Sequence, residues 1–245
     1  TISTGNPNLN PYYSENWDFS IEYFGKRASY LQLALFQKKV TNFVLELGET
    51  IDGSAGFPGL TLTPGETYTL ATFSNQHDAI NRGVEIAGRY RFVTLPSPFD
   101  GFYVDGSVTY TNSNGKYADR PGEDLPTYGA SEWLYFAGLG YEKGRFAALL
   151  SYRYRSDYLE GLESVDQQNR ELGFPPDSGD DWWGPEKYWN IETSVRMTDK
   201  FKVFCNISNL AEYTNYSTQS PFKNNYPEDS YWHKMRISFG LKGRF

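Results

Sequence analysis

The residues best suited to contact a ligand lie in one acidic and aromatic segment. Asp177, Asp180 and Asp181 precede the adjacent pair Trp182 and Trp183. Exposed indole rings can stack on the apolar faces of sugars or aromatic siderophores, and carboxylates can accept hydrogen bonds from sugar hydroxyls. The rings could also pack within their loop or cap the rim of a membrane barrel, and this interpretation is favoured because aromatic residues are expected at that interface. The carboxylates could bind calcium, but they lack calcium-loop spacing, which favours a solvated loop.

Catalytic and metal-binding patterns are not evident in the sequence. His77 and His233 are the only histidines and Cys205 is the only cysteine, and no metal-ligand spacing connects them. The segment from Gly53 to Gly56 is not a nucleophile elbow, and glycine-rich phosphate loops are absent. His233 falls on the apolar parity of its predicted strand without an evident partner, which argues against a lipase. We therefore expect no enzyme, no metal site and no cofactor.

Composition excludes other classes of protein. The formal net charge of −7 leaves no basic footprint for nucleic acid. Mean hydropathy is −0.61, and no apolar run approaches the roughly 20 residues of a spanning helix. Aromatic residues make up 18% of the chain, which is high for a soluble domain but suits the aromatic girdles of a membrane barrel.

The end of the chain shows the clearest periodicity. From Tyr231 to Phe245 one parity is mostly apolar, and the other carries Lys234, Arg236, Lys242 and Arg244. Side chains of a strand alternate between two faces, so the pattern predicts one long strand with an apolar and a cationic face. Typical globular strands have about five or six residues. A longer two-faced strand suits a transmembrane β-barrel, with lipid outside and water inside.

Similar alternation recurs along the chain and predicts an all-β protein, an antiparallel transmembrane β-barrel. The nine or so predicted strands lie near residues 14–24, 28–47, 67–93, 101–114, 131–142, 145–160, 187–198, 201–217 and 230–245. Short turns alternate with long loops, as in outer-membrane barrels, whose short turns are periplasmic. Bacterial single-chain barrels have even strand numbers, so an odd count predicts part of a larger barrel.

The polar parity of these strands supplies candidate residues for a lumen wall. The charged members are Arg153, Arg155, Arg196, Lys234 and Arg236, and Tyr103, Asp105 and Glu192 share the polar parity of their strands. They could guide a ligand through the barrel. They could also form a mutually neutralising, hydrated interior, which any water-filled barrel needs, and this second interpretation is favoured.

Several short motifs, in this order, resemble those of TonB-dependent outer-membrane receptors. Residues 5–11 and 14–18 are similar to the family's "GNP-L-P-E-S-N" segment, although Tyr12 stands where an acidic residue is usual. Residues 81–86 resemble its "GVE" strand, and residues 206–212 resemble its "NL" segment before the last hairpin. Each motif is weak alone, but their order and spacing make the resemblance specific.

Two further segments refine the resemblance. Residues 128–131 and 152–158 look like those of the Xanthomonas/Caulobacter-type branch, which is associated with uptake of carbohydrates and other complex nutrients. The terminal strand resembles the signal read by the barrel-assembly machinery, with Phe239, Leu241 and Phe245 as its apolar residues.

The resemblance implies a fold, a location and partners. The family's complete fold is a 22-stranded barrel enclosing an N-terminal plug. Residues 1–245 would be the C-terminal part of that barrel, without the plug. The expected location is the outer membrane of a Gram-negative cell. The expected partners are the lipid bilayer, the barrel-assembly machinery, a nutrient ligand and, through the plug, the TonB energy-transducing complex; nucleic acid is not expected.

The sequence thus predicts part of an active transporter that imports a bulky nutrient, such as a carbohydrate or a ferric siderophore. One alternative is a passive porin, against which the "GNP" and "GVE" motifs argue. Another is a soluble β-rich carbohydrate-binding module, which the length of the strands and the abundance of aromatic residues oppose.

Overall fold

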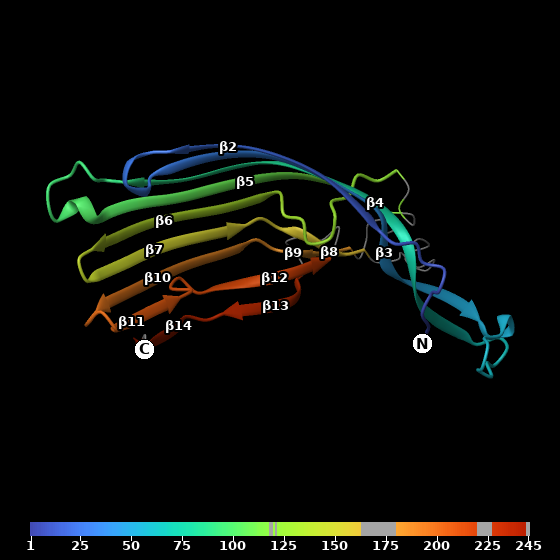
Figure 1. The fold of residues 1–245 in the computed structure, drawn as a ribbon. Coiled ribbons are helices and arrows are strands. Elements are labelled where there is room, and N and C mark those ends of the chain that lie inside the picture. The colour runs from blue at the N-terminus through green and yellow to red at the C-terminus, as the bar shows by residue number, and fades with distance from the viewer. Residues whose placement is uncertain (118–119, 121, 163–179, 220–226, 244–245) are drawn as a thin grey trace. The chain divides into compact units, whose positions relative to one another are not determined.

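The computed structural model describes residues 1–117, 120, 122–162, 180–219 and 227–243 (Figure 1). The strands are β1 (Ile2–Ser3), β2 (Tyr13–Phe24), β3 (Tyr30–Asp52), β4 (Thr67–Arg91), β5 (Phe102–Tyr117), β6 (Trp133–Lys143), β7 (Phe146–Arg155), β8 (Tyr158–Gly161), β9 (Asp181–Trp183), β10 (Glu186–Arg196), β11 (Phe201–Ser208), β12 (Tyr213–Gln219), β13 (Pro227–His233) and β14 (Arg236–Gly243). Three short 3-10 helices accompany them: η1 (Lys26–Ala28), η2 (Gly53–Ala55) and η3 (Phe99–Gly101). Among the described residues, no helix has the length and apolar character needed to cross a membrane.

Nine strands form one hydrogen-bonded path in the order β14-β11-β10-β7-β6-β5-β4-β3-β2. Strands β5, β6, β7, β10, β11 and β14 pair in antiparallel fashion, and the short β1 pairs with β4 in parallel. Strands β8, β9, β12 and β13 form a second sheet in the order β13-β12-β9-β8. The all-β class is confirmed, and each of the nine predicted strands supplies one strand of the main path.

The chain divides into two compact units. The first comprises residues 1–17, 38–81 and 114–125, and asparagine side chains hold its N-terminal segment. The Asn6 amide donates to the carbonyl oxygen of Phe73 at 2.8 Å, and the Asn75 amide donates to the carbonyl oxygens of Asn10 and Asn42 at 2.9 and 2.8 Å. These bonds fix the segment that carries the "GNP" motif against its own unit.

The second unit comprises residues 18–37, 82–113 and 126–245, and its sheet has one apolar face. The strand registers place six aliphatic residues in one continuous row across β5, β6, β7, β10, β11 and β14: Val104, Leu139, Leu150, Ile191, Ile207 and Ile237. On this face Phe239 is 83% exposed and Leu241 is 64% exposed. An exposed apolar surface of this extent is a feature of interfaces and membranes rather than of soluble monomers.

Aromatic rings of the apolar face gather in two rows. Near the short turns, Phe102 contacts Tyr141 at 4.9 Å between ring centres, and Tyr141 contacts Phe146 at 5.9 Å. Toward the opposite ends of the strands lie the pairs Tyr110–Trp133, Tyr135–Tyr154 and Tyr152–Trp189, whose ring centres are 4.8, 5.3 and 4.7 Å apart. Two aromatic rows that flank an aliphatic band are typical of the interfacial girdles of a membrane barrel.

The opposite, polar face accommodates aromatic rings over glycines. Tyr103 lies directly across from Gly140, and a Cβ atom on Gly140 would lie 2.0 Å from the Tyr103 ring. Phe204 covers Gly240 in the same way, with a corresponding distance of 2.9 Å. These glycines therefore provide the space that the rings of this face occupy.

Three of the predicted strands are each two strands in the structure. The predicted strand 201–217 ends at Ser208, because Asn209 and Glu212 adopt positive φ angles of 57° and 39°. The backbone N–H of Asn209 donates to Asn190 Oδ1 at 3.0 Å, and its side-chain amide donates to the carbonyl oxygen of His233. The predicted strands 145–160 and 230–245 break at residues 156–157 and 234–235. The segment after the first break, β8, and the segment before the second break, β13, belong to the second sheet.

The break at residues 234–235 overturns the predicted position of His233. Its ring stacks on Tyr213 at 4.8 Å and meets Tyr188 edge-on at 5.7 Å. Tyr188 pairs with Arg153, on the face opposite to Trp189 and the aliphatic row. His233 therefore lies with residues of the polar face, because alternation from β14 does not continue through the two-residue break.

Candidate functional site

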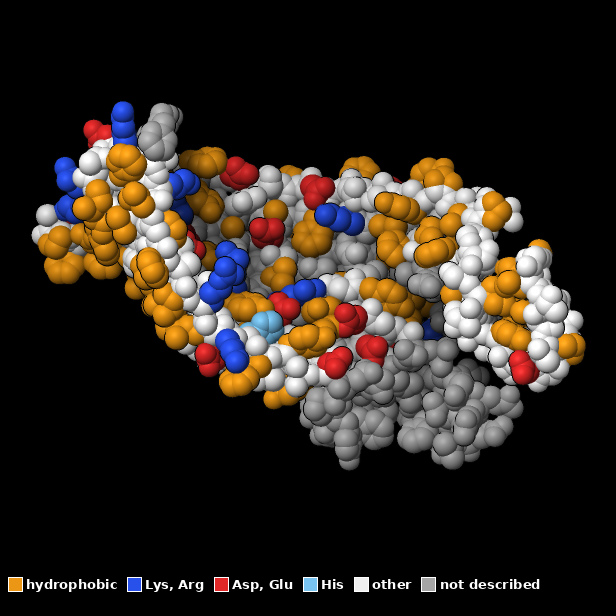
Figure 2. Space-filling view, turned by 90° about the horizontal axis from the view of Figure 1, so that it is seen from below, with side chains coloured by type: hydrophobic (Ala, Val, Ile, Leu, Met, Phe, Trp, Pro, Cys, Tyr) orange, Lys and Arg blue, Asp and Glu red, His pale blue; other side chains and the backbone are white. Residues whose placement is uncertain are grey.

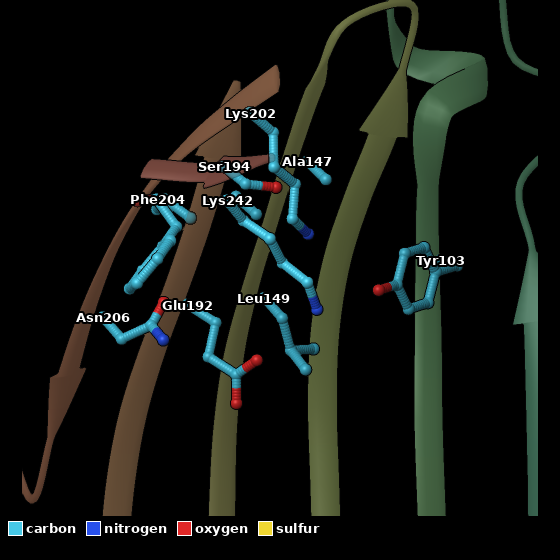
Figure 3. Close-up of a pocket in the computed structure, with 11 residues that line it drawn as sticks. Tyr103, Ala147, Leu149, Glu192, Ser194, Lys202, Phe204, Asn206 and Lys242 are labelled. Atoms are coloured by element: carbon cyan, nitrogen blue, oxygen red, sulfur yellow. The ribbon is translucent and has the colours of Figure 1, made fainter. Parts of the chain in front are cut away.

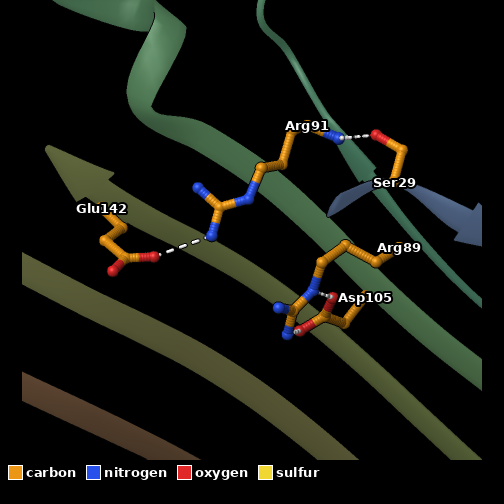
Figure 4. Close-up of polar contacts among 5 residues, drawn as sticks. All are labelled: Ser29, Arg89, Arg91, Asp105 and Glu142. Atoms are coloured by element: carbon orange, nitrogen blue, oxygen red, sulfur yellow. Dashed lines mark hydrogen bonds and ion pairs between the residues drawn. The ribbon is translucent and has the colours of Figure 1, made fainter. Parts of the chain in front are cut away.

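The charged side chains of β4, β5 and β6 form ion pairs on the polar face (Figure 4). Arg89 binds Asp105 in bidentate geometry, with Nε–Oδ1 and Nη2–Oδ2 distances of 2.5 and 2.8 Å. Arg91 Nη2 lies 2.7 Å from Glu142 Oε2. Both guanidinium groups lie near the face of the Tyr103 ring, at 4.9 and 5.1 Å from its centre. The positive and negative side chains in this part of the polar face therefore neutralise each other.

Further polar contacts fix the ends of these strands near the short turns. The backbone N–H of Arg91 donates to Ser29 Oγ at 3.1 Å, which ties the end of β4 to the start of β3 (Figure 4). The Lys143 ammonium donates to Ser97 Oγ at 2.8 Å and to an Asp100 carboxylate oxygen. The hydrogen bond from Lys143 lowers the pKa of the Asp100 carboxyl below its ordinary value.

A second group of polar residues lines a cavity of about 430 Å³ on the same face, over β7, β10, β11 and β14. Figure 3 shows the Lys202 and Lys242 side chains extending over β7, with the Tyr103 hydroxyl facing them from β5. Ser194 and Glu192 contribute a hydroxyl and a carboxylate to the lining. The site therefore combines two ammonium groups with one carboxylate and several neutral hydrogen-bonding groups.

The cations of this second group lie side by side. Arg196 pairs with Lys202 in the register of β10 and β11, and Lys202 pairs with Lys242 in the register of β11 and β14. Among the residues that the structure describes, no carboxylate lies within 4.0 Å of any of these three side chains. We refer to Arg196, Lys202 and Lys242 as the cationic row.

The polar face as a whole mixes charges of both signs. On the side of the molecule seen in Figure 2, Lys and Arg side chains are interspersed with Asp and Glu side chains. The cationic row differs from this general pattern, because its three members have the same sign and adjacent register positions.

The predicted ligand segment lies partly within the described residues. Trp182 pairs with Leu159 and Thr218, whereas Trp183 pairs with Tyr158 and Ser217. Neighbouring residues of β9 point to opposite faces, so the two indole rings do not form one platform. Trp183 packs on Tyr231 at 4.9 Å between ring centres. Asp180 is only 1% exposed, Asp181 begins β9, and Asp177 lies outside the described residues.

Trp183 also lines a cavity of about 760 Å³ beside the second sheet. Its other walls include Pro185, Lys187, Tyr213 and Tyr216. Burial raises the pKa of the Tyr213 hydroxyl above its ordinary value, and contact with Tyr188 adds to this effect. The cavity thus presents aromatic surface with a few polar groups, a composition common in small-molecule sites.

The predicted lumen cations occupy different environments. The Arg155 guanidinium donates to Ser131 Oγ and the Gly129 carbonyl oxygen at 2.8 and 2.6 Å and lies 3.8 Å from the centre of the Tyr158 ring, so it holds neighbouring chain segments together. Arg153 lies 5.8 Å from the centre of the Phe136 ring. Arg196 belongs to the cationic row, and Arg236 lies at the start of β14 opposite Ser208. Lys234 lies between β13 and β14, with its ammonium 4.8 Å from the centre of the Trp232 ring.

The residues predicted to form the barrel-assembly signal lie on β14 or beyond it. Phe239 pairs with Cys205 and Leu241 pairs with Val203, both on the apolar face. Phe245 lies outside the described residues. Recognition by the assembly machinery stays a prediction.

Sequence reasoning missed four charged residues, two in the ion pairs of β4–β6 and two in the lining of the cavity over β7, β10, β11 and β14. Arg89, Arg91, Lys202 and Lys242 were not among the predicted site residues. A two-residue turn at Asp199-Lys200 would pair Arg196 with Val203, so the turn motif does not predict the observed pairing of Arg196 with Lys202. The pairing of Arg89 with Asp105 depends on the register between β4 and β5, which alternation does not supply.

Comparison with known proteins identifies the family of this two-faced sheet. Residues 1–210 match the family described as "TonB dependent receptor-like, beta-barrel". The chain belongs to the TonB-dependent receptor family. The match covers most of the chain but does not distinguish the Xanthomonas/Caulobacter-type branch. No curated protein matches the sequence.

Two solved structures of transporters show the same fold. The copper transporter OprC has a TM-score of 0.58 and 16% sequence identity, and the match covers 96% of this chain and 31% of OprC. The ferric citrate transporter FecA in its unliganded form has a TM-score of 0.59 and 14% identity, and the match covers 94% of this chain and 30% of FecA. The chain therefore spans about a third of the length of these proteins.

Membership of the TonB-dependent receptor family indicates the cellular location of this chain. Barrels of this family are proteins of the Gram-negative outer membrane and serve transport rather than catalysis. In a barrel of this kind an apolar face meets lipid and a polar face lines the interior. The cationic row and the ion pairs of β4–β6 lie on the polar face.

Proposed function

We propose that this chain forms part of the wall of an outer-membrane transporter that imports a bulky nutrient with energy supplied through TonB. The chain contributes barrel strands, a polar interior surface and the second sheet beyond the membrane strands. It has no catalytic role in this proposal and uses no cofactor. A nutrient such as a carbohydrate or a ferric siderophore is the expected cargo.

The observation that carries the proposal is the two-sided sheet of the second unit. Its apolar face bears an unbroken aliphatic row from Val104 to Ile237, with aromatic rows on either side. Its polar face bears charges that a lipid environment would not tolerate. A sheet with these two faces separates lipid from a hydrated interior, as transport through a barrel requires.

In this proposal a plug and further barrel strands surround the chain. Residues 1–245 form part of the barrel domain, and a plug elsewhere in the full-length protein contacts the TonB complex. An open sheet edge cannot face lipid, so further strands complete the barrel. The apolar residues of β14, including Phe239 and Leu241, serve as the signal for the barrel-assembly machinery.

The cavity beside the second sheet is the proposed region of cargo contact. Trp183 and Tyr216 supply aromatic surface there, and Asp157 supplies a carboxylate. This combination suits a sugar or an aromatic siderophore, since both present flat apolar faces and hydroxyl groups. The resemblance to the carbohydrate-associated branch favours the sugar.

Growth and uptake measurements test the proposal. Deletion of the gene should abolish growth on the transported glycan while leaving growth under iron limitation unchanged, and loss of TonB should have the same effect as the deletion. The reverse growth phenotype would replace the carbohydrate with a siderophore. Uptake that continues undiminished without TonB would contradict active transport and favour the passive porin.

A further inference from the structure

We infer that the cavity between Lys202 and Lys242 binds an oxyanion group, a carboxylate or a phosphate. The inference concerns binding on the interior face and does not depend on transport or on the identity of the cargo. It rests on charge, register and the groups that line the cavity.

The charge pattern points to a missing anion. The chain has a net charge of −7, yet three cations occupy consecutive register positions here, and in the described part of the chain no carboxylate lies within ion-pair distance of them. Like charges directly opposite each other on neighbouring strands are destabilising. An anion between Lys202 and Lys242 converts this repulsion into two favourable interactions.

The lining supplies suitable hydrogen-bond donors. Figure 3 shows the ammonium groups of both lysines extending toward the same space, on the side where the Tyr103 hydroxyl lies. Ser194 adds a second hydroxyl, and Glu192 is the carboxylate of the lining, more than 4.0 Å from both ammonium groups. Ammonium groups form charge-assisted hydrogen bonds with carboxylate and phosphate oxygens, and hydroxyl groups can donate to the same oxygens.

Small side chains leave room for such a group. Ala147 and Ser194 lie opposite each other on β7 and β10, and both line the cavity. Its volume of about 430 Å³ exceeds that of a single carboxylate or phosphate several-fold, so the group can belong to a larger molecule or to a polypeptide. The ligand chemistry is therefore an oxyanion, with a dissolved molecule or another part of the same protein as its source.

Lysine labelling of the full-length protein in detergent separates these sources. The amines are acetylated in chloride buffer with and without inorganic phosphate at constant ionic strength, and mass spectrometry gives the rate at each lysine. For a dissolved anion, phosphate at about four times its Kd should slow labelling of Lys202 and Lys242 roughly fivefold. Lys26, in the turn between β2 and β3, is the control and should label at an unchanged rate.

A carbodiimide reaction tests the second source, since it joins an amine to a carboxylate in direct contact. A carboxylate from elsewhere in the protein should yield a cross-link to Lys202 or Lys242 but not to Lys26, and a cross-link to Glu192, which lines the same cavity, does not count as support. The variant K242Q should remove phosphate protection of Lys202 or reduce its cross-linking, whereas K26Q should change neither. If phosphate protects neither lysine and neither forms a cross-link to a carboxylate other than Glu192, the inference is overturned.

Discussion

Two regions of the same polar face differ in whether their cationic side chains have carboxylate partners. Across β4, β5 and β6, Arg89 and Arg91 each have a carboxylate partner, and Asp105 retains only 11% side-chain exposure. Across β10, β11 and β14, the cationic row has no such partner within the described residues. The first region is complete as it stands, whereas the second is arranged to receive an anion.

The difference shows that a polar lumen wall is not one uniform, neutralised surface. In the paired region, removing one charge should leave its partner desolvated and unpaired, which is costly. In the cationic row, removing or reversing one charge should relieve repulsion. The same kind of substitution is therefore expected to have opposite effects on stability in the two regions.

The largest effect is expected from breaking the bidentate pair. R89Q leaves the nearly buried Asp105 carboxylate without its partner and should lower the free energy of unfolding by about 2–3 kcal/mol. Urea unfolding of the full-length protein in detergent measures this change. The double variant R89Q/D105N should recover part of the loss; a double variant as unstable as the sum of the single variants would show that the two residues act independently.

A glycine substitution probes Tyr103, whose ring contacts the paired region and whose hydroxyl faces the cavity. G140A places a Cβ atom 2.0 Å from that ring and should cost about 1–2 kcal/mol through displacement of the side chain. G106A is the matched control, since its nearest contact would be an ordinary 3.7 Å. Equal unfolding midpoints for G140A and G106A would contradict the tight packing between Tyr103 and Gly140.

Charge reversal in the cationic row should stabilise the protein. K242E places a carboxylate directly opposite Lys202 and should raise the free energy of unfolding by about 0.2–1 kcal/mol in buffer without added oxyanions. K26E, in an exposed turn, should have no comparable effect. A lower unfolding midpoint for K242E than for the wild type would show that the row is already neutralised by a bound group, and removal of that group should then restore the expected gain.

The smallest effect concerns the turn pair Asp100–Lys143, which has the same self-neutralising character as the paired region. The pKa of the Asp100 carboxyl is lowered, so its carboxylate form stabilises the fold above the ordinary aspartate pKa of about 3.9. This stabilisation is lost as the pH falls through the lowered pKa. D100N should therefore lower the unfolding midpoint at pH 7 and match the wild type in strong acid. D199N, which removes a carboxylate from a turn without an ion pair among the described residues, is the control for the substitution itself.

Much of the membrane architecture was accessible from alternation alone. The apolar parity of nine segments predicted the strands of the main path, and the short turns predicted which neighbours pair. These features follow from local chemistry, because each strand separately must present one apolar face. The predicted polar positions of Tyr103, Asp105 and Glu192 follow from the same alternation and agree with the registers.

The remaining features depend on interactions between distant segments. Asn209 ends β11 through contacts with Asn190 and His233, and no local sequence pattern predicts these contacts. Trp182 and Trp183 are adjacent in the sequence, but their placement within β9 turns them to opposite faces. Ion pairs on the polar face likewise require the register between strands, which tertiary packing decides.

The central claim is that one face of this sheet meets lipid and the other meets water within an outer-membrane barrel. A nitroxide scan along β7 tests it directly, with single cysteines from Ala147 to Tyr152 in a full-length C205S protein kept in native outer membranes. Labels at residues 148, 150 and 152 should collide mainly with dissolved oxygen, and labels at 147, 149 and 151 mainly with a water-soluble nickel complex. Equal accessibility on both parities, or recovery of the protein in the soluble fraction, would contradict the account.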